Sequence, residues 1–525
     1  MMKGTSVESK YKYMLGEASK DRFEGINLSD AASESNFIRS NGVFTAIPWK
    51  SGGGGVIAVM KAYEYKRLEA DLPLIKGHAG PIVDFDFSPF NDNLFATASE
   101  DGSIKLWVIP EDGITQDTSD CDAELRGHSR KLIFSKFHPS SDYTLASSSA
   151  DCTIRIWDIS QQRCALTYDD IKQTTTGLEW SQNGSLLGAM TKNRTLNVFD
   201  PRKEGSALSA NTHEGARPQK LCWLGDNQTI FTAGFSKVAE REYSVWDIRD
   251  MSQPLIKKRL DEYAGIPFTF FDDDAKVLYI AGKGESQISF FQYSPESPNI
   301  VDYLHAYKGK EPQKGFSFMP KRCVDVMTCE VARGVRLTAK TVEYVYFKVP
   351  RKAGNFQADL FPPCRSGEPA TKFEEYWTGI DKEPLRQEMR PETHHQEHAA
   401  QIQRRSTFMA KLGDKSGNSV SASGSSLGGS SNNQQNVIEE LKQEIETLTV
   451  RCEKLSDQLK LSNNQLTEVT EQASSSRQEV TELEYRIQSL QEENTQLKDQ
   501  LTQYQAPQTS SEQQQEKSDL YSFDS

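Results

Sequence analysis

A run of glycines, Ser51-Gly-Gly-Gly-Gly55, is the first stretch of this 525-residue chain that could do chemistry, because it could cradle a phosphate group. A P-loop needs Lys followed by Ser or Thr after its last glycine, and Val56 and Ile57 stand there instead. A dinucleotide-binding loop needs a helix to follow, whereas Val56–Met60 is rich in β-branched residues, which favour a strand. The glycine run therefore indicates a turn between two strands and argues against a nucleotide-binding enzyme.

A second pattern combines a histidine, a hydroxyl, an aspartate and a tryptophan. It occurs as His78, Thr97, Asp101 and Trp107 and again as His128, Ser147, Asp151 and Trp157. A His, an Asp and a Ser could form a catalytic triad. In both sets, however, a Gly-His pair precedes the tryptophan by 30 residues and the aspartate precedes it by six, a recurrence typical of WD40 repeats. We therefore expect each set to form a buried chain of hydrogen bonds, from aspartate through histidine and hydroxyl to the indole, that stabilises one four-stranded blade.

Weaker copies of this repeat extend over the first 350 residues. They run from Leu178 to Phe199, from Leu221 to Trp246, from Phe268 to Phe291 and from Gly315 to Lys348, and a hairpin over Phe44–Met60 adds one more. The total predicts an all-β fold, a seven-bladed WD40 β-propeller over residues 1–352. Because an open ring would expose a strand edge, we expect the stretch around Tyr11–Leu15 to supply an outer strand to the last blade.

The bulk composition excludes several classes of protein. The net charge is −13, of which −9 belongs to residues from 388 onward, so no nucleic-acid partner is expected. The eight cysteines include no C-x-x-C pair, which suits reduced thiols in the cytoplasm and gives no zinc framework. The N-terminus has no apolar stretch for a signal peptide, and no window is long enough to span a membrane. We predict no cofactor, no metal and no catalytic residue, and hence no enzyme.

Segments of different character follow the predicted propeller. Residues 353–387 are rich in Pro, Gly and aromatic residues and are expected to pack on the propeller as an extended brace. Residues 388–436 have the composition of a flexible, disordered linker, and residues 506–525 that of a disordered acidic tail. Within the linker, Arg404-Arg-Ser-Thr407 resembles a basic-directed kinase site, and the histidines at 394, 395 and 398 indicate a solvated cluster rather than a metal site.

Residues 437–505 carry an unbroken heptad pattern, which predicts a C-terminal α-helical coiled coil. The residues expected to join the chains are Ile445, Leu448, Leu455, Leu459, Leu483, Ile487, Leu490, Asn494, Leu497 and Leu501. Asn494 favours a parallel dimer, because two buried amides can satisfy each other. Arg486-Ile-Gln-Ser-Leu-Gln491 resembles a trimer motif, but Gln491 replaces the Glu that would pair with Arg486. The pattern predicts a homo-oligomer and leaves dimer, trimer and antiparallel bundle open.

Irregular stretches outside the repeat pattern resemble the coronins, a family of WD40 proteins, over roughly residues 9–385. The stretches that carry the resemblance include Ser9–Tyr13, Ser51–Gly55, His213–Pro218, Gly234–Glu242, Ala281–Glu285, Met319–Cys323, Cys329–Arg333, Val349–Lys352 and Asp359–Pro363. The resemblance implies a cytoplasmic F-actin-binding protein that bundles filaments and modulates filament turnover and the actin-branching complex. It also implies a place in the actin cytoskeleton at the cell cortex and in phagocytic or leading-edge structures.

One segment departs from the family pattern. Where the family carries Ile-Arg-Val-Ser-Arg, this chain has Ile26-Asn-Leu-Ser-Asp30. The second arginine of that segment is associated with filament contact in some members, so Asp30 reverses the charge at that point. The resemblance leaves two alternatives: the propeller holds actin through other residues, or it binds actin weakly.

Other basic residues expected on propeller loops could together form a patch complementary to an acidic filament. They are Arg126, Arg130, Lys131, Arg202, Lys203, Lys220, Lys237 and Arg241. With the coiled coil joining several propellers, weak contacts would reinforce one another and crosslink filaments without catalysis. The alternative interpretation is a WD40 scaffold or adaptor that recruits non-actin partners, as in trafficking or ubiquitin-ligase assembly.

Overall fold

A computed structural model describes residues 9–391, apart from residues 30, 32–34, 51, 53, 70, 204–207, 226 and 353, together with Arg486. Several sequence predictions lie outside this description: Asp30, the linker from residue 392, the remainder of the coiled coil and the tail 506–525. No helix among the described residues is long and apolar enough to cross a membrane.

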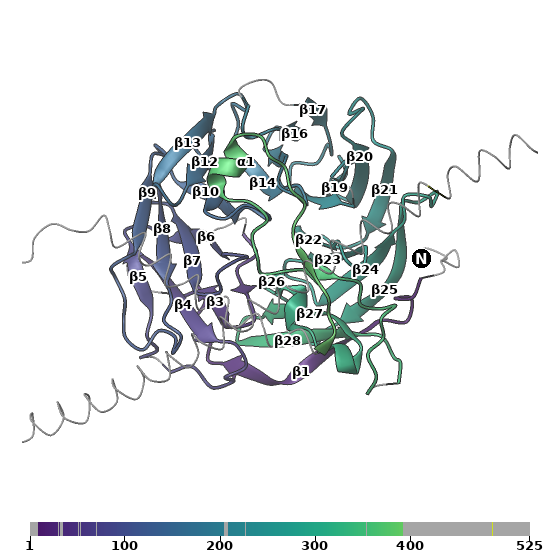
Figure 1. Cartoon of the computed structure of the whole chain (residues 1–525), viewed down its shortest axis with the longest axis horizontal. Helices are drawn as coiled ribbons and strands as arrows, with labels where there is room; N and C mark the ends of the chain where they lie inside the picture. The colour runs from purple at the N-terminus through teal and green to yellow at the C-terminus, as the bar shows by residue number, and fades with distance from the viewer. Residues whose placement is uncertain are drawn as a thin grey trace, which may run out of the picture. The chain divides into compact units, whose positions relative to one another are not determined.

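Seven four-stranded antiparallel sheets are arranged as blades around a common axis, which confirms the predicted seven-bladed propeller (Figure 1). We letter the strands of each blade a to d from the axis outward. Blade 1 holds β2 (Arg39–Ser40), β3 (Phe44–Pro48), β4 (Gly55–Lys61) and β5 (Ile75–His78). Blade 2 holds β6 (Ile82–Phe87), β7 (Leu94–Ser99), β8 (Ser103–Val108) and β9 (Ala123–Arg126). Blade 3 holds β10 (Leu132–Phe137), β11 (Thr144–Ser149), β12 (Ile154–Asp158) and β13 (Arg163–Tyr168).

The next blades follow the same order along the chain. Blade 4 holds β14 (Thr175–Trp180), β15 (Leu187–Thr191), β16 (Thr195–Phe199) and β17 (Leu208–Asn211). Blade 5 holds β18 (Lys220–Leu224), β19 (Thr229–Phe235), β20 (Arg241–Asp247) and β21 (Ile256–Asp261). Blade 6 holds β22 (Pro267–Asp272), β23 (Val277–Gly282), β24 (Gln287–Tyr293) and β25 (Val301–Lys308). Blade 7 combines β26 (Gly315–Phe318), β27 (Glu330–Leu337) and β28 (Thr341–Lys348) with β1 (Leu15–Glu24).

The b strands are rich in small and β-branched residues because neighbouring blades cover both of their faces. Every residue of β7 (Leu-Phe-Ala-Thr-Ala-Ser) and of β11 (Thr-Leu-Ala-Ser-Ser-Ser) is buried. Small side chains let adjacent sheets approach, and large ones fill the remaining space. Trp157 of blade 3, for example, packs in one cluster with Ala96 and Ala98 of blade 2. This pattern explains why the repeats are recognisable even where the Gly-His and Trp signals are lost.

Of the glycine run, the structure describes Gly52, Gly54 and Gly55, which lie between β3 and β4 and at the start of β4, as the sequence indicates. Gly54 has φ +74°, a left-handed conformation that side chains strain. A Cβ on Gly55 would lie 2.3 Å from the carbonyl oxygen of Gly80, on the loop from blade 1 to blade 2. Glycine is therefore required here by close backbone approach and not by a ligand.

The N-terminal segment closes the ring, but with different residues from those predicted. The outer strand of blade 7 is Leu15–Glu24, which pairs antiparallel with β28 from Leu15 opposite Lys348 to Glu24 opposite Thr341. The stretch predicted to form that strand instead makes a turn whose side chains Tyr11 and Met14 are buried between blades 6 and 7. The error has a simple cause: Leu15–Glu24 is mostly polar and half exposed, so it carries no strand signal.

After β28 the chain crosses one end of the ring (Figure 1). Two single turns, η1 (Lys321–Cys323) and η2 (Val326–Thr328), lie earlier in blade 7, and the crossing segment contains β29 (Cys364–Arg365), α1 (Phe373–Trp377) and β30 (Arg386–Gln387). We call residues 354–391 the brace. β29 pairs with β30, and Met389 beyond them is fully buried, so the packed segment continues past residue 387.

Candidate functional site

The two ends of the ring differ in what they present. Because strands alternate in direction, a–b and c–d connections lie at one end and b–c and d–a connections at the other. The brace contacts the first kind: Asp142 N donates to Thr371 O at 3.0 Å, and Arg365 donates to Gln182 O at 2.9 Å. We call this the brace end. The b–c turns and d–a loops face the opposite way.

Exposed cations outnumber exposed carboxylates at that opposite end, which we call the basic end. Among the described residues of its turns and loops, eleven Lys or Arg and six Asp or Glu are exposed. The cations are Lys50, Arg130, Lys131, Lys172, Lys192, Arg194, Arg217, Lys237, Lys310, Lys314 and Lys340, and the carboxylates are Asp169, Asp170, Glu214, Glu240, Glu262 and Glu311. This surface is electropositive although the chain as a whole is acidic.

Four of the eight predicted basic residues lie at this end. Arg130 and Lys131 are on the loop from blade 2 to blade 3, Arg126 ends the strand before it, and Lys237 is on the b–c turn of blade 5. Two of them are partly neutralised, since Lys131 pairs with Glu100 at 2.7 Å and Arg126 with a neighbouring glutamate at 2.9 Å. Exposed pairs of this kind leave most of the charge available to a partner.

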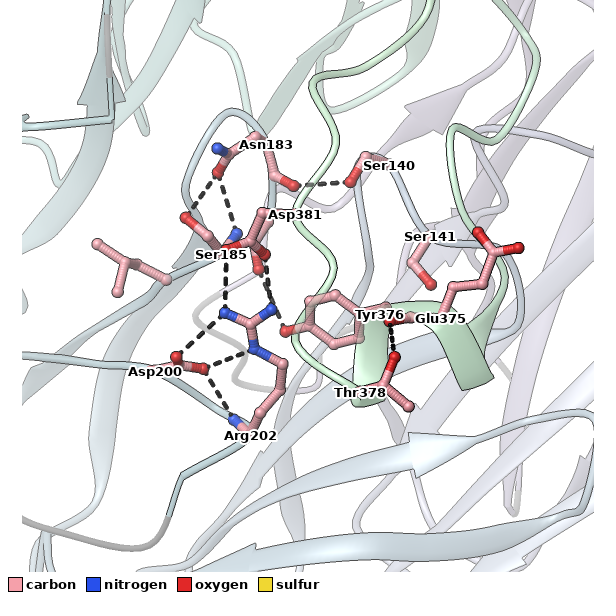
Figure 2. A network of polar contacts seen from close by, with 12 residues as sticks. Ser140, Ser141, Asn183, Ser185, Asp200, Arg202, Glu375, Tyr376, Thr378 and Asp381 are labelled. Carbon is pink, nitrogen blue, oxygen red and sulfur yellow. Dashed lines mark hydrogen bonds and ion pairs between the residues drawn. The ribbon is translucent and has the colours of Figure 1, made fainter.

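Arg202 was predicted on a free loop, but it fastens the brace instead (Figure 2). Its guanidinium donates to both oxygens of Asp200 at 2.8 and 3.0 Å and to both oxygens of Asp381 on the brace at 2.6 and 3.2 Å. It also lies 4.9 Å from the ring centre of Tyr376 in α1. Only 8 % of its side chain is exposed, so it is not available to a filament.

Two further residues of the predicted basic patch are buried, and a third, Lys203, lies at the brace end. Arg241 is 2 % exposed and joins blades 5 and 6 by pairing with Asp261 at 2.7 Å and Glu285 at 2.8 Å. Lys220 starts the innermost strand of blade 5, where its ammonium donates to a backbone carbonyl at 2.8 Å. Lys203 is exposed, but on the c–d loop of blade 4 at the brace end. Long-range packing, which single residue types do not reveal, decides all these placements.

The two predicted sets of His, hydroxyl, Asp and Trp are chains of short contacts. In blade 2, His78 Nδ1 lies 2.9 Å from Asp101 Oδ2, and His78 Nε2 lies 2.8 Å from Thr97 Oγ1. The Trp107 indole donates to the same Thr97 oxygen at 2.9 Å, which leaves the hydroxyl hydrogen for the histidine. The equivalent distances among His128, Asp151, Ser147 and Trp157 are 2.9, 2.8 and 2.7 Å.

These chains have the same order of hydrogen-bonded groups as a catalytic triad, carboxylate to histidine to hydroxyl. Unlike a triad, they are not accessible to a substrate. Thr97 and Ser147 are 0 % exposed and lie beneath the tryptophans. Burial alone would raise the pKa of Asp151, but hydrogen bonds from Thr153 and His128 lower it to about 2. The carboxylate therefore stays ionised and orients its histidine, which is a structural role.

A third chain of the same kind stands in blade 5 and was missed by sequence reasoning. His213 Nδ1 lies 2.9 Å from Glu242, its Nε2 lies 3.0 Å from Thr232, and the Trp246 indole donates to Thr232 at 3.0 Å. The carboxylate here is a Glu four residues before the tryptophan, not an Asp six before it, so the repeat spacing hides it. The usable signal was His213–Pro218, whose histidine starts the chain.

His138 lies beneath the brace at the brace end. Its ring centre is 4.4 Å from that of Tyr376, and its Nδ1 accepts from the backbone N–H of Ser141 at 2.8 Å. Its Nε2 therefore carries the hydrogen and donates to Gly184 O at 3.1 Å. Burial lowers the pKa of His138 to about 3, against the opposing effect of the Gly184 hydrogen bond, and the charge of Arg202 lowers it further.

Acid should weaken the fold through His138. Because its pKa falls from 6.5 in the unfolded chain to about 3 in the folded one, its contribution is complete above pH 6.5 and is lost as the pH falls toward 3. Between pH 6 and 4.5, the free energy of unfolding should fall by up to about 1.4 kcal/mol per pH unit more steeply than in His138→Gln. Urea unfolding at several pH values measures both slopes. Equal slopes would show that His138 does not cause the loss of stability in acid. The control is His305→Gln, because His305 is exposed.

Comparisons with known proteins agree on one family. Models of the WD domain, G-beta repeat, match residues 71–108 and 119–158, a type of WD40 repeat matches 342–384, and a domain of unknown function (DUF1899) matches 6–67. Coronin-A of Dictyostelium discoideum is 39% identical over 378 residues, which cover 72% of this chain and 84% of that protein. The crystal structure of the WD40 domain of Toxoplasma gondii coronin matches with a TM-score of 0.69 at 31% identity, over 74% of this chain and 100% of that chain. The chain therefore belongs to the coronin family.

Proposed function

We propose that this chain binds F-actin and regulates the organisation and turnover of actin filaments in the cytoplasm. The proposal rests on the basic end of a coronin-family propeller, where exposed cations outnumber exposed carboxylates opposite the brace. The family is one of non-enzymatic binding proteins, and the buried His-containing chains fit that role. We further propose that the protein acts at the cell cortex and in phagocytic or leading-edge structures.

The electrostatics of the basic end suit an acidic filament. Cations spread over several loops attract a partner of opposite charge from a distance and raise the rate of encounter, and salt screens this attraction. The brace end is partly covered by residues 354–391, whose contacts include the Arg202–Asp381 ion pair. The basic end is therefore the surface proposed to meet the filament, with Arg126, Arg130, Lys131 and Lys237 among its residues.

One propeller gives one weak contact, so crosslinking needs a second. We propose that the heptad region 437–505 joins propellers into a homo-oligomer, so that the second contact becomes intramolecular and the two reinforce each other. Bundling of filaments follows from this arrangement. Action on the actin-branching complex is proposed from family membership.

Removal of residues 437–525 should separate binding from bundling. The full chain should bring filaments down at low centrifugal speed, where only bundles sediment, whereas residues 1–436 should leave them in the supernatant. At high speed, where single filaments sediment, the shortened chain should still bind, with an affinity for filaments roughly 10²-fold lower. Deletion of 506–525 alone is the control and should bundle normally.

Two outcomes would overturn parts of this proposal. Bundling by residues 1–436 would show that crosslinking does not need the heptad region. A full chain that stays in solution at both speeds would favour the adaptor interpretation, in which the propeller recruits non-actin partners.

A further inference from the structure

Two stretches outside the WD-repeat matches build one continuous part of the basic end. Residues 212–219 form the d–a loop from blade 4 to blade 5, and residues 236–240 form the b–c turn of blade 5. The N–H of Gly215 donates to the carbonyl of Phe235 at 2.7 Å, and a Cβ on Gly215 would lie 2.6 Å from Phe235. The loop is thus pressed against the base of the turn.

The b–c turn of blade 5 exposes an apolar side chain to solvent. Val238 is 76 % exposed, the largest value among the large hydrophobic residues that the structure describes. Its turn is fixed by hydrogen bonds from Ser236 N to Glu240 O at 2.8 Å and from Ala239 N to Ser236 O at 2.9 Å. Ala239 adopts φ +64°, a left-handed conformation that costs free energy in a residue with a side chain. A β-branched side chain is stiff as well, so Val238 is held in place before any partner arrives.

Three exposed cations lie on these loops and on the neighbouring b–c turn of blade 4, where the loops themselves also carry the exposed carboxylates Glu214 and Glu240. Arg217 lies 5.1 Å from the Phe235 ring centre and donates to the carbonyl of Ala264, and Arg194 donates to Glu214 O at 2.7 Å. Lys237 is the residue next to Val238 and is exposed. Among the described residues, no carboxylate lies within ion-pair distance of these three side chains. By contrast, Lys131 in the blade 2–3 sector is paired with Glu100.

We infer that Val238 is the apolar anchor of the filament contact and that Arg194, Arg217 and Lys237 form its charged rim. This arrangement, an apolar centre enclosed by polar groups, is how the binding energy of protein interfaces is concentrated. A single exposed valine by itself would need no explanation. Here a strained turn and three unpaired cations accompany it. The partner it fits is a protein surface with a shallow apolar depression bordered by carboxylates. The inference rests on the proposed binding of F-actin.

Substitution of Val238 tests the anchor. We expect Val238→Ser in the full chain to weaken binding to F-actin about tenfold or more in high-speed sedimentation, the loss typical of a central interface residue. Since the loss is of apolar contact, the ratio to wild type should stay the same from 50 to 200 mM salt. Val238→Leu should retain binding, and the melting temperature should not change because the site is exposed.

The matched control is Leu255→Ser. Leu255 is 54 % exposed on the c–d connection of the same blade, at the brace end, and its loss should change affinity by less than twofold. If wild type binds and Val238→Ser binds equally well, the anchor is wrong while the proposed function stands. If wild type itself does not bind, the proposed function fails, and the anchor with it.

Discussion

Deletion of residues 1–24 should leave a ring that does not close and a protein that aggregates. Blade 7 would lose β1, whose pairing with β28 spans Leu15 to Glu24, and would expose the edge of β28. The buried side chains of Tyr11, Met14 and Phe23 would be lost as well. At ~1.5–3 kcal/mol each, their burial amounts to roughly 5–9 kcal/mol, comparable with the whole stability of a typical domain. Size-exclusion chromatography and thermal unfolding measure the outcome.

Point substitutions in the same turn sharpen this test. Tyr11 is 1 % exposed, and its hydroxyl donates to Leu360 O of the brace at 3.0 Å, so Tyr11→Ala should cost roughly 3–5 kcal/mol. Tyr13, two residues away, is 68 % exposed, and Tyr13→Ala should change stability by less than about 0.5 kcal/mol. A deleted chain that stays monodisperse with an unchanged melting temperature would show that the ring is closed by other means.

The hydrogen bond between Tyr11 and the brace links two distant parts of the chain. Lys10 also donates to the carbonyl of Asp359, so the brace holds the segment that leads into the closing strand. Ring closure and brace docking should therefore be lost together on heating, as one cooperative unit.

Structural features formed by residues close together in the chain could be predicted from the sequence. The two chains that begin at His78 and His128 each lie within about thirty residues, and turn chemistry fixes their geometry. The β-branched residues from Val56 onward were enough to predict that the glycine run lies between two strands.

Structural features that depend on residues far apart in the chain could not be predicted from the sequence. Leu15 pairs with Lys348, more than three hundred residues away, and nothing in Leu15–Glu24 announces a strand. The fate of a basic side chain is equally non-local: Arg241 is buried because Glu285 and Asp261 come to it from other strands. A list of Lys and Arg on expected loops therefore mixed exposed cations with structural ones, and it left out Arg194 and Arg217.

Neutralising the charged rim should weaken filament binding in a salt-dependent way. The triple variant Arg194→Gln, Arg217→Gln and Lys237→Gln removes three exposed cations that have no carboxylate partner among the described residues. At ~0.5 kcal/mol for each exposed charge contact, affinity should fall about tenfold at low salt. The difference from wild type should shrink as salt rises, because screening removes the same attraction. Arg194 and Arg217 also donate to the backbone carbonyls of Glu214 and Ala264, so the melting temperature of the variant is compared with that of wild type to check the fold.

A charge-matched control is available at the brace end. Arg163, Lys203 and Arg249 are 60, 79 and 72 % exposed in their side chains, at or next to c–d connections. Their replacement by Gln changes the net charge equally while leaving the basic end intact. Any loss shared by both triple variants is an effect of net charge, and only the excess loss in the rim variant reports a contact.

High-speed sedimentation of the full chain with filaments across a salt series, with both triple variants in parallel, measures whether the basic end binds F-actin. We expect wild type and the brace-end variant to pellet with filaments at 50 mM salt and the rim variant to stay largely in the supernatant. At high salt the three proteins should pellet to the same extent. Equal pelleting of the rim variant and wild type at 50 mM salt, or no pelleting of wild type at all, would contradict binding of F-actin by the basic end.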